Sequence, residues 1–185
     1  MIVELALVTA GLAVGAGIAR ALRKKPTARP EPSAAGPRRL RLGDVLVHPD
    51  GDLWIQGRMT LREGPESLTL LRTQGAPHAD WLLEPRPDEL HVLVPTVGVP
   101  PGRVPSELRR GPLIARLIRR GPVAVETEGE GLPPTTPKAE LVVLGCPNGD
   151  RILVLDFADG SRLALEGRPL DRGLVDVLPG GDAKP

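Results

Sequence analysis

Aromatic side chains are nearly missing from this sequence. The chain of 185 residues has no tyrosine, and phenylalanine, tryptophan and tyrosine together make up 2% of it. Proteins that bind single-stranded nucleic acids stack the bases on aromatic side chains that lie beside lysine and arginine. The sequence contains no such platform, so it argues against a nucleic-acid partner.

Cysteine and histidine are also scarce. Cys146 is the only cysteine, which excludes an intrachain disulfide and a four-cysteine metal site and agrees with a reducing cytoplasm. The three histidines, His48, His78 and His91, lack a metal-binding spacing such as His-x-x-x-His. Asp50-Gly51-Asp52 has two carboxylates of a calcium loop without the other ligands, so we interpret it as a turn. We predict no metal site and no cofactor.

Sequence signatures of enzymes are absent as well. There is no Gly-x-Ser-x-Gly motif, phosphate loop or dinucleotide-binding fingerprint. Cys146 could act as a nucleophile with His48, His78 or His91 as its base. However, it precedes Pro147 at the mouth of a predicted turn and lacks the flanking residues of thiol enzymes. We therefore predict no catalytic residues, and an enzyme with an unrecognised Cys146/His site is the alternative.

The chain begins with a long apolar run. From Ile2 to Ala19 the only ionisable side chain is Glu4. A helix of about 18–20 such residues is long enough to cross a bilayer. A cleaved signal peptide would carry its positive charge before the apolar run, whereas here the charge follows it. We predict a retained transmembrane helix at residues 1–22, with Ile2–Ala19 in the membrane.

Basic residues follow the apolar run, and they predict its orientation. They are Arg20, Arg23, Lys24 and Lys25, whereas no basic side chain precedes the run. The positive-inside rule then predicts a single-pass protein of the bacterial inner membrane, with its N-terminus outside and the remainder cytoplasmic. The four basic side chains are also suited to contact anionic lipid headgroups. Residues 23–39 form a basic, Pro-rich linker that we expect to be an extended spacer.

Residues 40–179 predict a β domain, which a short tail at 180–185 follows. Short apolar runs alternate with turns that contain Gly, Pro, Asp or Asn, and helical periodicity is rare. Antiparallel hairpins of this kind close into a small barrel or a sandwich. The runs that we expect to be strands are 44–48, 53–56, 67–73, 81–84, 90–94 and 123–126.

Two further expectations concern the conformation of one segment and the burial of the tryptophans. Residues 113–120 fit either two helical turns or a strand with basic residues at its end, and we prefer the strand. Trp54 and Trp81 lie within expected strands, where we expect both indole rings to be buried by packing.

Parts of the sequence recur in the same order. Residues 45–52 are matched by 143–150, which share a Pro-Asp/Asn-Gly-Asp turn, and residues 83–87 are echoed by 165–169. We interpret the recurrence as two related β halves, about 40–96 and 121–179, in one pseudo-symmetric domain. The alternative is that such turns recur in any β protein because Pro, Asp, Asn and Gly favour them.

The segment Leu40-Arg41-Leu42-Gly43-Asp44-Val45, the hairpin with Gly57 and the step Trp81-Leu82 resemble a known family. It is a bacterial family of small β-rich domains of unknown function, in which such motifs often occur twice in one chain. The resemblance implies an association with membrane-linked operons and envelope stress systems, and it implies no catalytic residues.

Taken together, these features predict a membrane-anchored, non-enzymatic binding or scaffold protein of a bacterial membrane-associated assembly. We expect its partner to be a protein, which could add a strand to a free edge of the sheet. A periplasm-facing module with the same fold is an alternative for its orientation.

Overall fold

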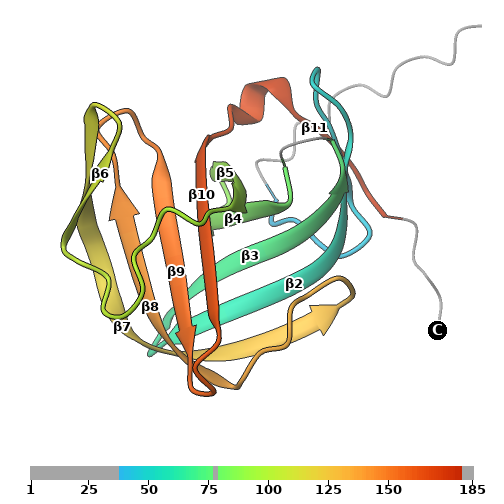
Figure 1. The fold of residues 1–185 in the computed structure, drawn as a ribbon. Helices are drawn as coiled ribbons and strands as arrows, with labels where there is room; N and C mark the ends of the chain where they lie inside the picture. The colour runs from blue at the N-terminus through green and yellow to red at the C-terminus, as the bar shows by residue number, and fades with distance from the viewer. Residues whose placement is uncertain (1–37, 77–78, 181–185) are drawn as a thin grey trace, which may run out of the picture. The chain divides into compact units, whose positions relative to one another are not determined.

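The computed structural model of the protein describes residues 38–76 and 79–180, which are almost entirely antiparallel β structure (Figure 1). The expected mainly β class is therefore confirmed for these residues. One short 3-10 helix, η1 (Arg172–Leu174), precedes the last strand. The strands are β1 (Val45–Val47), β2 (Leu53–Glu63), β3 (Glu66–Gly75), β4 (Trp81–Arg86), β5 (Glu89–Pro95), β6 (Glu107–Arg110), β7 (Leu113–Gly129), β8 (Lys138–Gly145), β9 (Arg151–Phe157), β10 (Arg162–Pro169) and β11 (Asp176–Leu178).

The strands form one sheet that closes on itself. Their order is β11-β1-β2-β3-β4-β5-β10-β9-β8-β7-β6, and an additional pairing joins β2 to β7. This pairing closes the eight strands from β2 through β10 to β7 into an antiparallel barrel. The structure thereby selects the barrel from the two predicted architectures, the barrel and the sandwich. Strands β1, β11 and β6 lie outside the closed ring.

The interior of the barrel is filled by apolar side chains that alternate along the strands. In β2, for example, Met59 and Leu61 are buried while Thr60 between them is partly exposed. Because side chains on a strand point alternately to opposite faces, this pattern places one set of residues inside the barrel. The buried members of this inner core are Met59, Leu61, Leu68, Leu70, Trp81, Leu83, Leu93, Val123, Val125, Ala139, Leu141, Val143, Leu153, Leu155, Phe157 and Leu165.

Two further apolar clusters lie outside the barrel wall. We call the segments that cover them the first wing (residues 38–55 and 170–180) and the second wing (residues 97–117). Strand β9 is buried on both faces because the inner core covers one face and the second wing covers the other. The first cluster contains Leu40, Leu46, Leu53, Ile55, Leu71, Ala79, Leu82 and Leu90, and the second contains Val104, Ala115, Val142, Leu144, Cys146, Ile152 and Val154.

The two halves of the chain follow the same path. In each half a short wing strand, β1 or β6, pairs with the beginning of a long strand, β2 or β7. Each long strand then passes through an irregularity, at Ile55/Gly57 in β2 and at Leu117/Arg119 in β7. Beyond this point the two long strands pair with each other. The repeat in connectivity is therefore β1–β5 and β6–β10.

The recurring sequence motifs do not coincide with this repeat in connectivity. Residues 49–52 join β1 to β2, whereas residues 147–150 join β8 to β9. In the repeat of connectivity the counterpart of the β1–β2 turn is the β6–β7 turn, so these two connections are not equivalent. The expected start of the second half at residue 121 falls inside β7. Both segments are turns in which Gly51 and Gly149 have positive φ angles of 130° and 91°. We attribute the recurrence of the motif to the chemistry of tight turns.

The remaining sequence-based expectations have different outcomes. Residues 113–120 are part of strand β7, as preferred. Trp81 is buried in the inner core, as expected, but the expectation for Trp54 was wrong because 56% of its surface is exposed. Leu53 and Ile55, on either side of Trp54, belong to the first outer cluster and are buried. Because side chains on a strand alternate between its two faces, the indole ring of Trp54 points to solvent.

The predicted transmembrane helix at residues 1–22 lies outside the described residues, as does most of the linker at 23–39. Within the described ranges, no helix has both the length and the apolar character that crossing a bilayer requires.

Both ends of the described chain are held by the buried carboxylate of Asp44. It accepts hydrogen bonds from Nη2 of Arg38 at 3.1 Å and from the backbone N–H of Arg41 at 2.9 Å. The backbone N–H of Gly180 also donates to it, at 3.1 Å. One side chain thus fixes the point where the chain enters the domain next to the point where it leaves.

A second buried carboxylate, Glu84, supports the same region. It accepts hydrogen bonds from the backbone N–H of Leu40 at 3.3 Å and from Nη2 of Arg172 at 2.8 Å. Burial raises the pKa of Glu84, while the hydrogen bond from Leu40 and the charge of Arg172 oppose this shift. These bonds connect strand β4 of the barrel to both segments of the first wing.

Gly57 is predicted to be essential for closure of the barrel. A Cβ atom at this position would lie 2.9 Å from Cγ of Leu132 and would overlap the carbonyl oxygen of Glu130. Gly57→Ala should lower the free energy of unfolding by about 1–3 kcal/mol, as overpacking typically does. Thr60 is a half-buried residue on the same strand and serves as the control. Thr60→Ala should lower the free energy of unfolding by less than about 1 kcal/mol. Urea unfolding of the full chain in mild detergent measures both, and equal effects would contradict the prediction.

Candidate binding groove

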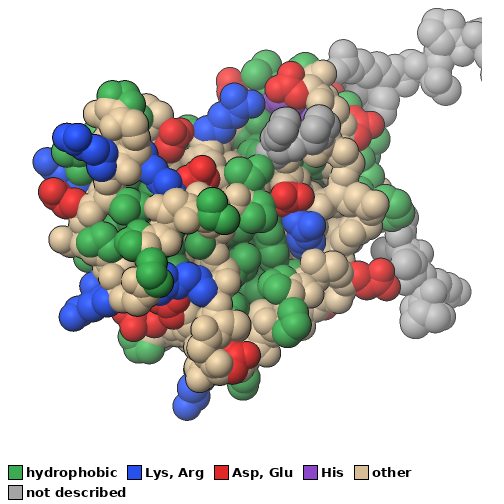
Figure 2. Space-filling model, viewed as in Figure 1, with side chains coloured by type: hydrophobic (Ala, Val, Ile, Leu, Met, Phe, Trp, Pro, Cys, Tyr) green, Lys and Arg blue, Asp and Glu red, His purple; other side chains and the backbone are tan. Residues whose placement is uncertain are grey.

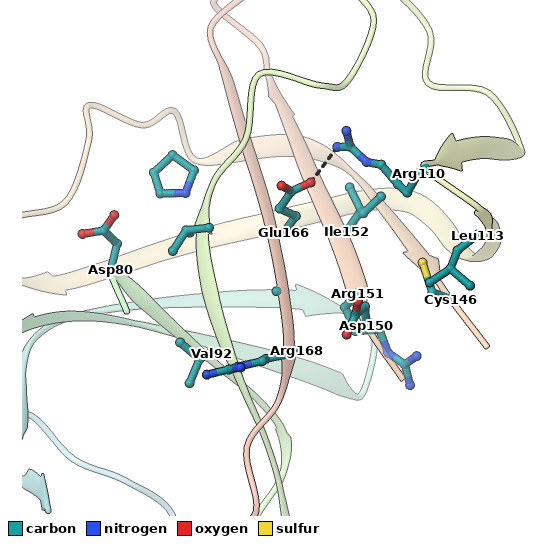
Figure 3. Close-up of a pocket in the computed structure, with 14 residues that line it drawn as sticks. Asp80, Val92, Arg110, Leu113, Cys146, Asp150, Arg151, Ile152, Glu166 and Arg168 are labelled. Atoms are coloured by element: carbon teal, nitrogen blue, oxygen red, sulfur yellow. Dashed lines mark ion pairs between the residues drawn. The ribbon is translucent and has the colours of Figure 1, made fainter. Parts of the chain in front are cut away.

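A groove of about 1050 Å³ crosses the outer surface of the barrel beside the second wing. Figure 2 shows the hollow, in which apolar side chains are exposed between two raised lobes. Strands β5, β9 and β10 form its floor, Asp80 lies on one side, and the β6–β7 turn and Cys146 lie on the other (Figure 3). The lining residues are Asp80, Val92, Val94, Pro95, Arg110, Gly111, Leu113, Cys146, Asp150, Arg151, Ile152, Glu166, Gly167 and Arg168.

The β5 part of the floor is apolar because the barrel strands alternate. Leu93 faces the inner core, so its neighbours Val92 and Val94 on β5 face the groove. Gly167 on the paired strand β10 lies opposite Leu93. A Cβ atom at Gly167 would overlap the carbonyl oxygen of Val92, so glycine permits the close approach of the two strands here. Glu166 and Arg168 flank Gly167 on β10 and line the groove, so the floor combines an apolar strip on β5 with charged side chains on β10.

An ion pair holds one side of the groove in place. Nη2 of Arg110, at the end of β6, lies 2.8 Å from Oε2 of Glu166 on β10 (Figure 3). The same nitrogen donates to Oγ1 of Thr96 at 3.2 Å. These contacts connect the second wing to the barrel, so the shape of the groove depends on them. The pair is partly exposed, and its contribution to stability alone is expected to be small.

A second charged group supports Arg151, which also lines the groove. Nη2 of Arg151 lies 3.8 Å from Oε1 of Glu89. Glu89 Oε1 also lies 3.0 Å from Nε2 of the buried His91, and Glu89 Oε2 accepts a hydrogen bond from Nη2 of Arg86 at 3.0 Å. The hydrogen bond with His91 lowers the pKa of Glu89, and that with Arg86 adds to the effect. Glu89 is therefore ionised at neutral pH, and its carboxylate holds the side chains of Arg86, His91 and Arg151 around it.

Cys146 lies in the wall of the groove, and its thiol is poorly suited to act as a nucleophile. Burial raises its pKa, and the negative charge of Asp150 raises the pKa further. The thiol is therefore protonated at neutral pH, whereas the reactive form is the thiolate. Among the described residues that line the groove there is no histidine.

The predicted histidine partners of Cys146 lie elsewhere or outside the described residues. His48 belongs to the β1–β2 turn, where its Nδ1 accepts a hydrogen bond from the backbone N–H of Asp50 at 3.1 Å. His91 contacts Glu89, as described above, and His78 lies outside the described residues. The structure thus surrounds Cys146 with the charged groups of Arg110, Asp150, Arg151 and Glu166 instead. Within the described ranges, no cluster of His, Cys, Asp or Glu could hold a metal ion.

The sequence analysis did not predict the groove residues Arg110, Glu166 and Arg168. Each stands in a strand whose charged residues resemble those of other strands of the chain, so no local pattern distinguishes them. The echo between 83–87 and 165–169 pointed to the segment that contains Glu166 and Arg168, but as a repeat and not as a site. Arg110 on β6 meets Glu166 on β10 only in the folded protein, because the two strands are distant in sequence.

The comparisons with known proteins give no match. No protein-family model, no curated protein and no solved structure is significantly similar to the chain. The resemblance to the β-rich bacterial family of unknown function therefore stays a prediction that depends on Leu40–Val45, Gly57 and Trp81-Leu82.

The pKa shift of Glu89 predicts a specific pH dependence of stability. In the folded protein this pKa lies below its ordinary value of 4.5. The stability that ionised Glu89 contributes is therefore fully present above about pH 4.5 and is lost as the pH falls through the lower folded-state pKa. The free energy of unfolding should be higher for wild type than for Glu89→Gln at pH 7, and this difference in free energy should shrink in acid.

Urea unfolding of both proteins over a pH series measures this difference. Glu107→Gln, which removes an exposed carboxylate of an ion pair with Arg116, is the matched control and should show little difference at any pH. A difference between wild type and Glu89→Gln that stays constant or grows in acid would contradict the assignment.

Proposed function

We propose that the protein is a membrane-anchored, non-enzymatic binding or scaffold subunit of a bacterial membrane-associated assembly. Residues 1–22 would anchor it in the inner membrane, and the β barrel would bind a protein partner in the groove between Asp80 and the second wing. The observation that carries the proposal is the groove itself. It exposes an apolar strip on β5 beside charged side chains on β10, and an ion pair fixes its side. Protein-binding surfaces have this combination of features.

The packing of the barrel supports an outer binding surface. Bulky apolar side chains fill the interior, so a partner would have to bind outside. Strand addition at a free sheet edge is less suitable, because the outermost strands β6 and β11 contain only four and three residues. Edges of this length offer few backbone hydrogen bonds to a partner strand. The groove is therefore the surface that we assign to the partner.

The protonated thiol of Cys146 supports binding over catalysis, since a nucleophilic mechanism needs a nearby base. The basic residues that follow the apolar run support a cytoplasmic location for the β domain, residues 40–179, which we call the head. A periplasm-facing head is the alternative, and it predicts the opposite topology.

The anchor and its orientation can be tested together. Full-length protein should remain in the membrane fraction after an alkaline carbonate wash, and deletion of residues 1–22 should release the head, because a membrane-spanning helix is removed only by detergent. Added protease should digest the head in inverted inner-membrane vesicles and not in intact spheroplasts. Release of the full-length protein by carbonate would refute the anchor. Digestion in spheroplasts would support the periplasm-facing alternative.

The groove can be tested with a matched pair of substitutions. Val94→Arg places a charge on the apolar floor, whereas Val97→Arg makes the same change three residues away at a fully exposed position. A partner that co-purifies with wild type in mild detergent should be lost by about tenfold or more with Val94→Arg, because the long charged side chain fills the apolar strip and must lose water when the partner binds. It should be retained with Val97→Arg. Equal recovery with both variants would exclude the groove as the binding surface.

A further inference from the structure

An apolar row crosses the outer face of the first wing. Trp54 on β2 lies opposite Val45 on β1, and Val45 lies opposite Leu178 on β11. Trp54 and Leu178 are 56% and 47% exposed, and Val45 between them is half-buried. Side chains directly opposite each other on paired strands are neighbours. The three residues, which we call the Trp54 row, therefore form one continuous exposed surface.

The exposure of Trp54 is unusual within this chain. The chain has two tryptophans, and the other, Trp81, is buried in the inner core. Exposing an indole ring forgoes a large gain from burial. A contiguous exposed apolar surface marks an interaction site more often than isolated apolar residues do. Tryptophan in particular favours the interface between a bilayer and water, where its apolar ring and its polar N–H are both accommodated.

The Trp54 row lies next to the point where the chain enters the domain. The backbone N–H of Gly43 donates to the carbonyl oxygen of Ile55 at 2.9 Å, which places the beginning of the described domain beside Trp54. Asp44 holds Arg38 at 3.1 Å, so this entrance is fixed. From the predicted end of the anchor at residue 22 to Arg38, the linker spans at most roughly 53–58 Å even when it is fully extended. The tether therefore keeps the row close to the membrane at a high effective concentration.

The charges around the row also suit a lipid surface. Arg39 and Arg41 are exposed at the entrance, and they continue the basic segment that follows the apolar run. Two acidic residues, Asp52 and Asp176, lie close to the row, so the row itself is not a basic patch. Its affinity would come from Trp54 and Leu178, while the arginines beside it would contribute through anionic headgroups.

We propose that the Trp54 row docks on the surface of the same bilayer that holds the N-terminal anchor, with Trp54 at the level of the lipid headgroups. This inference rests on the proposed anchor and deepens it, because it fixes the face that the head turns to the membrane. The three residues of the row do not line the groove. Docking therefore leaves the groove free for a partner.

The absence of tyrosine and the presence of only two tryptophans make a direct fluorescence test feasible. The full chain is reconstituted into vesicles of phosphatidylethanolamine with a minority of phosphatidylglycerol, and flotation establishes that the protein is anchored. Acyl chains brominated near the headgroup then quench any indole ring at the interface. Trp81→Phe, which retains only Trp54, should lose about half of its emission or more. Trp54→Phe, which retains only buried Trp81, should lose little.

The outcomes separate the docking from the anchor. Flotation with no quenching of Trp54 overturns the docking and leaves the anchor intact, whereas failure to float overturns the anchor. Shielding of Trp54 from aqueous acrylamide without quenching by brominated lipid assigns the row to a protein surface, and it likewise overturns the docking. If Trp81→Phe does not fold, subtracting the emission of Trp54→Phe from that of wild type gives the Trp54 signal.

Discussion

The pairing of β2 with β7 is the interaction on which the structure depends. Gly57 and Gly129 are directly opposite each other where the two strands meet, and a side chain at either position would collide with the facing backbone. Gly129 also has a positive φ of 87°, which glycine adopts without strain. The backbone N–H of Glu130 then donates to the carbonyl oxygen of Gln56 at 2.9 Å. Without this pairing the strands would form an open sheet with long unpaired edges on β2 and β7.

Closure of the barrel also creates the wings and the groove. Because the second half of β2 pairs with β7, only its first residues remain for β1, and the beginning of β7 is likewise left for β6. The wing strands therefore lean over the outer faces of neighbouring strands and bury the two outer clusters there. On the opposite side of the ring, β5 pairs with β10, and their outer face stays partly uncovered as the floor of the groove.

Electrostatic contacts in this protein position segments more than they stabilise the core. Asp44 and Glu84 hold the chain's entrance and the first wing, while the pair between Arg110 and Glu166 holds the second wing. The contacts of Asp44 with Gly180, of Glu84 with Leu40 and Arg172, and of Arg110 with Glu166 join parts that are distant in sequence. A rigid scaffold with exposed apolar surfaces is what a binding subunit requires, because ordering the surface in advance reduces the cost of association.

The sequence alone determined the β class, most strand positions and the tight turns, because alternation and turn chemistry are local properties. Strand β7 and the burial of Trp81 followed from the same rules. Only the tertiary structure decided that the sheet closes, that Trp54 points to solvent, and that Arg110, Glu166 and Cys146 share a groove. These features depend on which strands pair across more than fifty residues, and the pairing of β2 with β7 and of β5 with β10 leaves no local signal in the sequence.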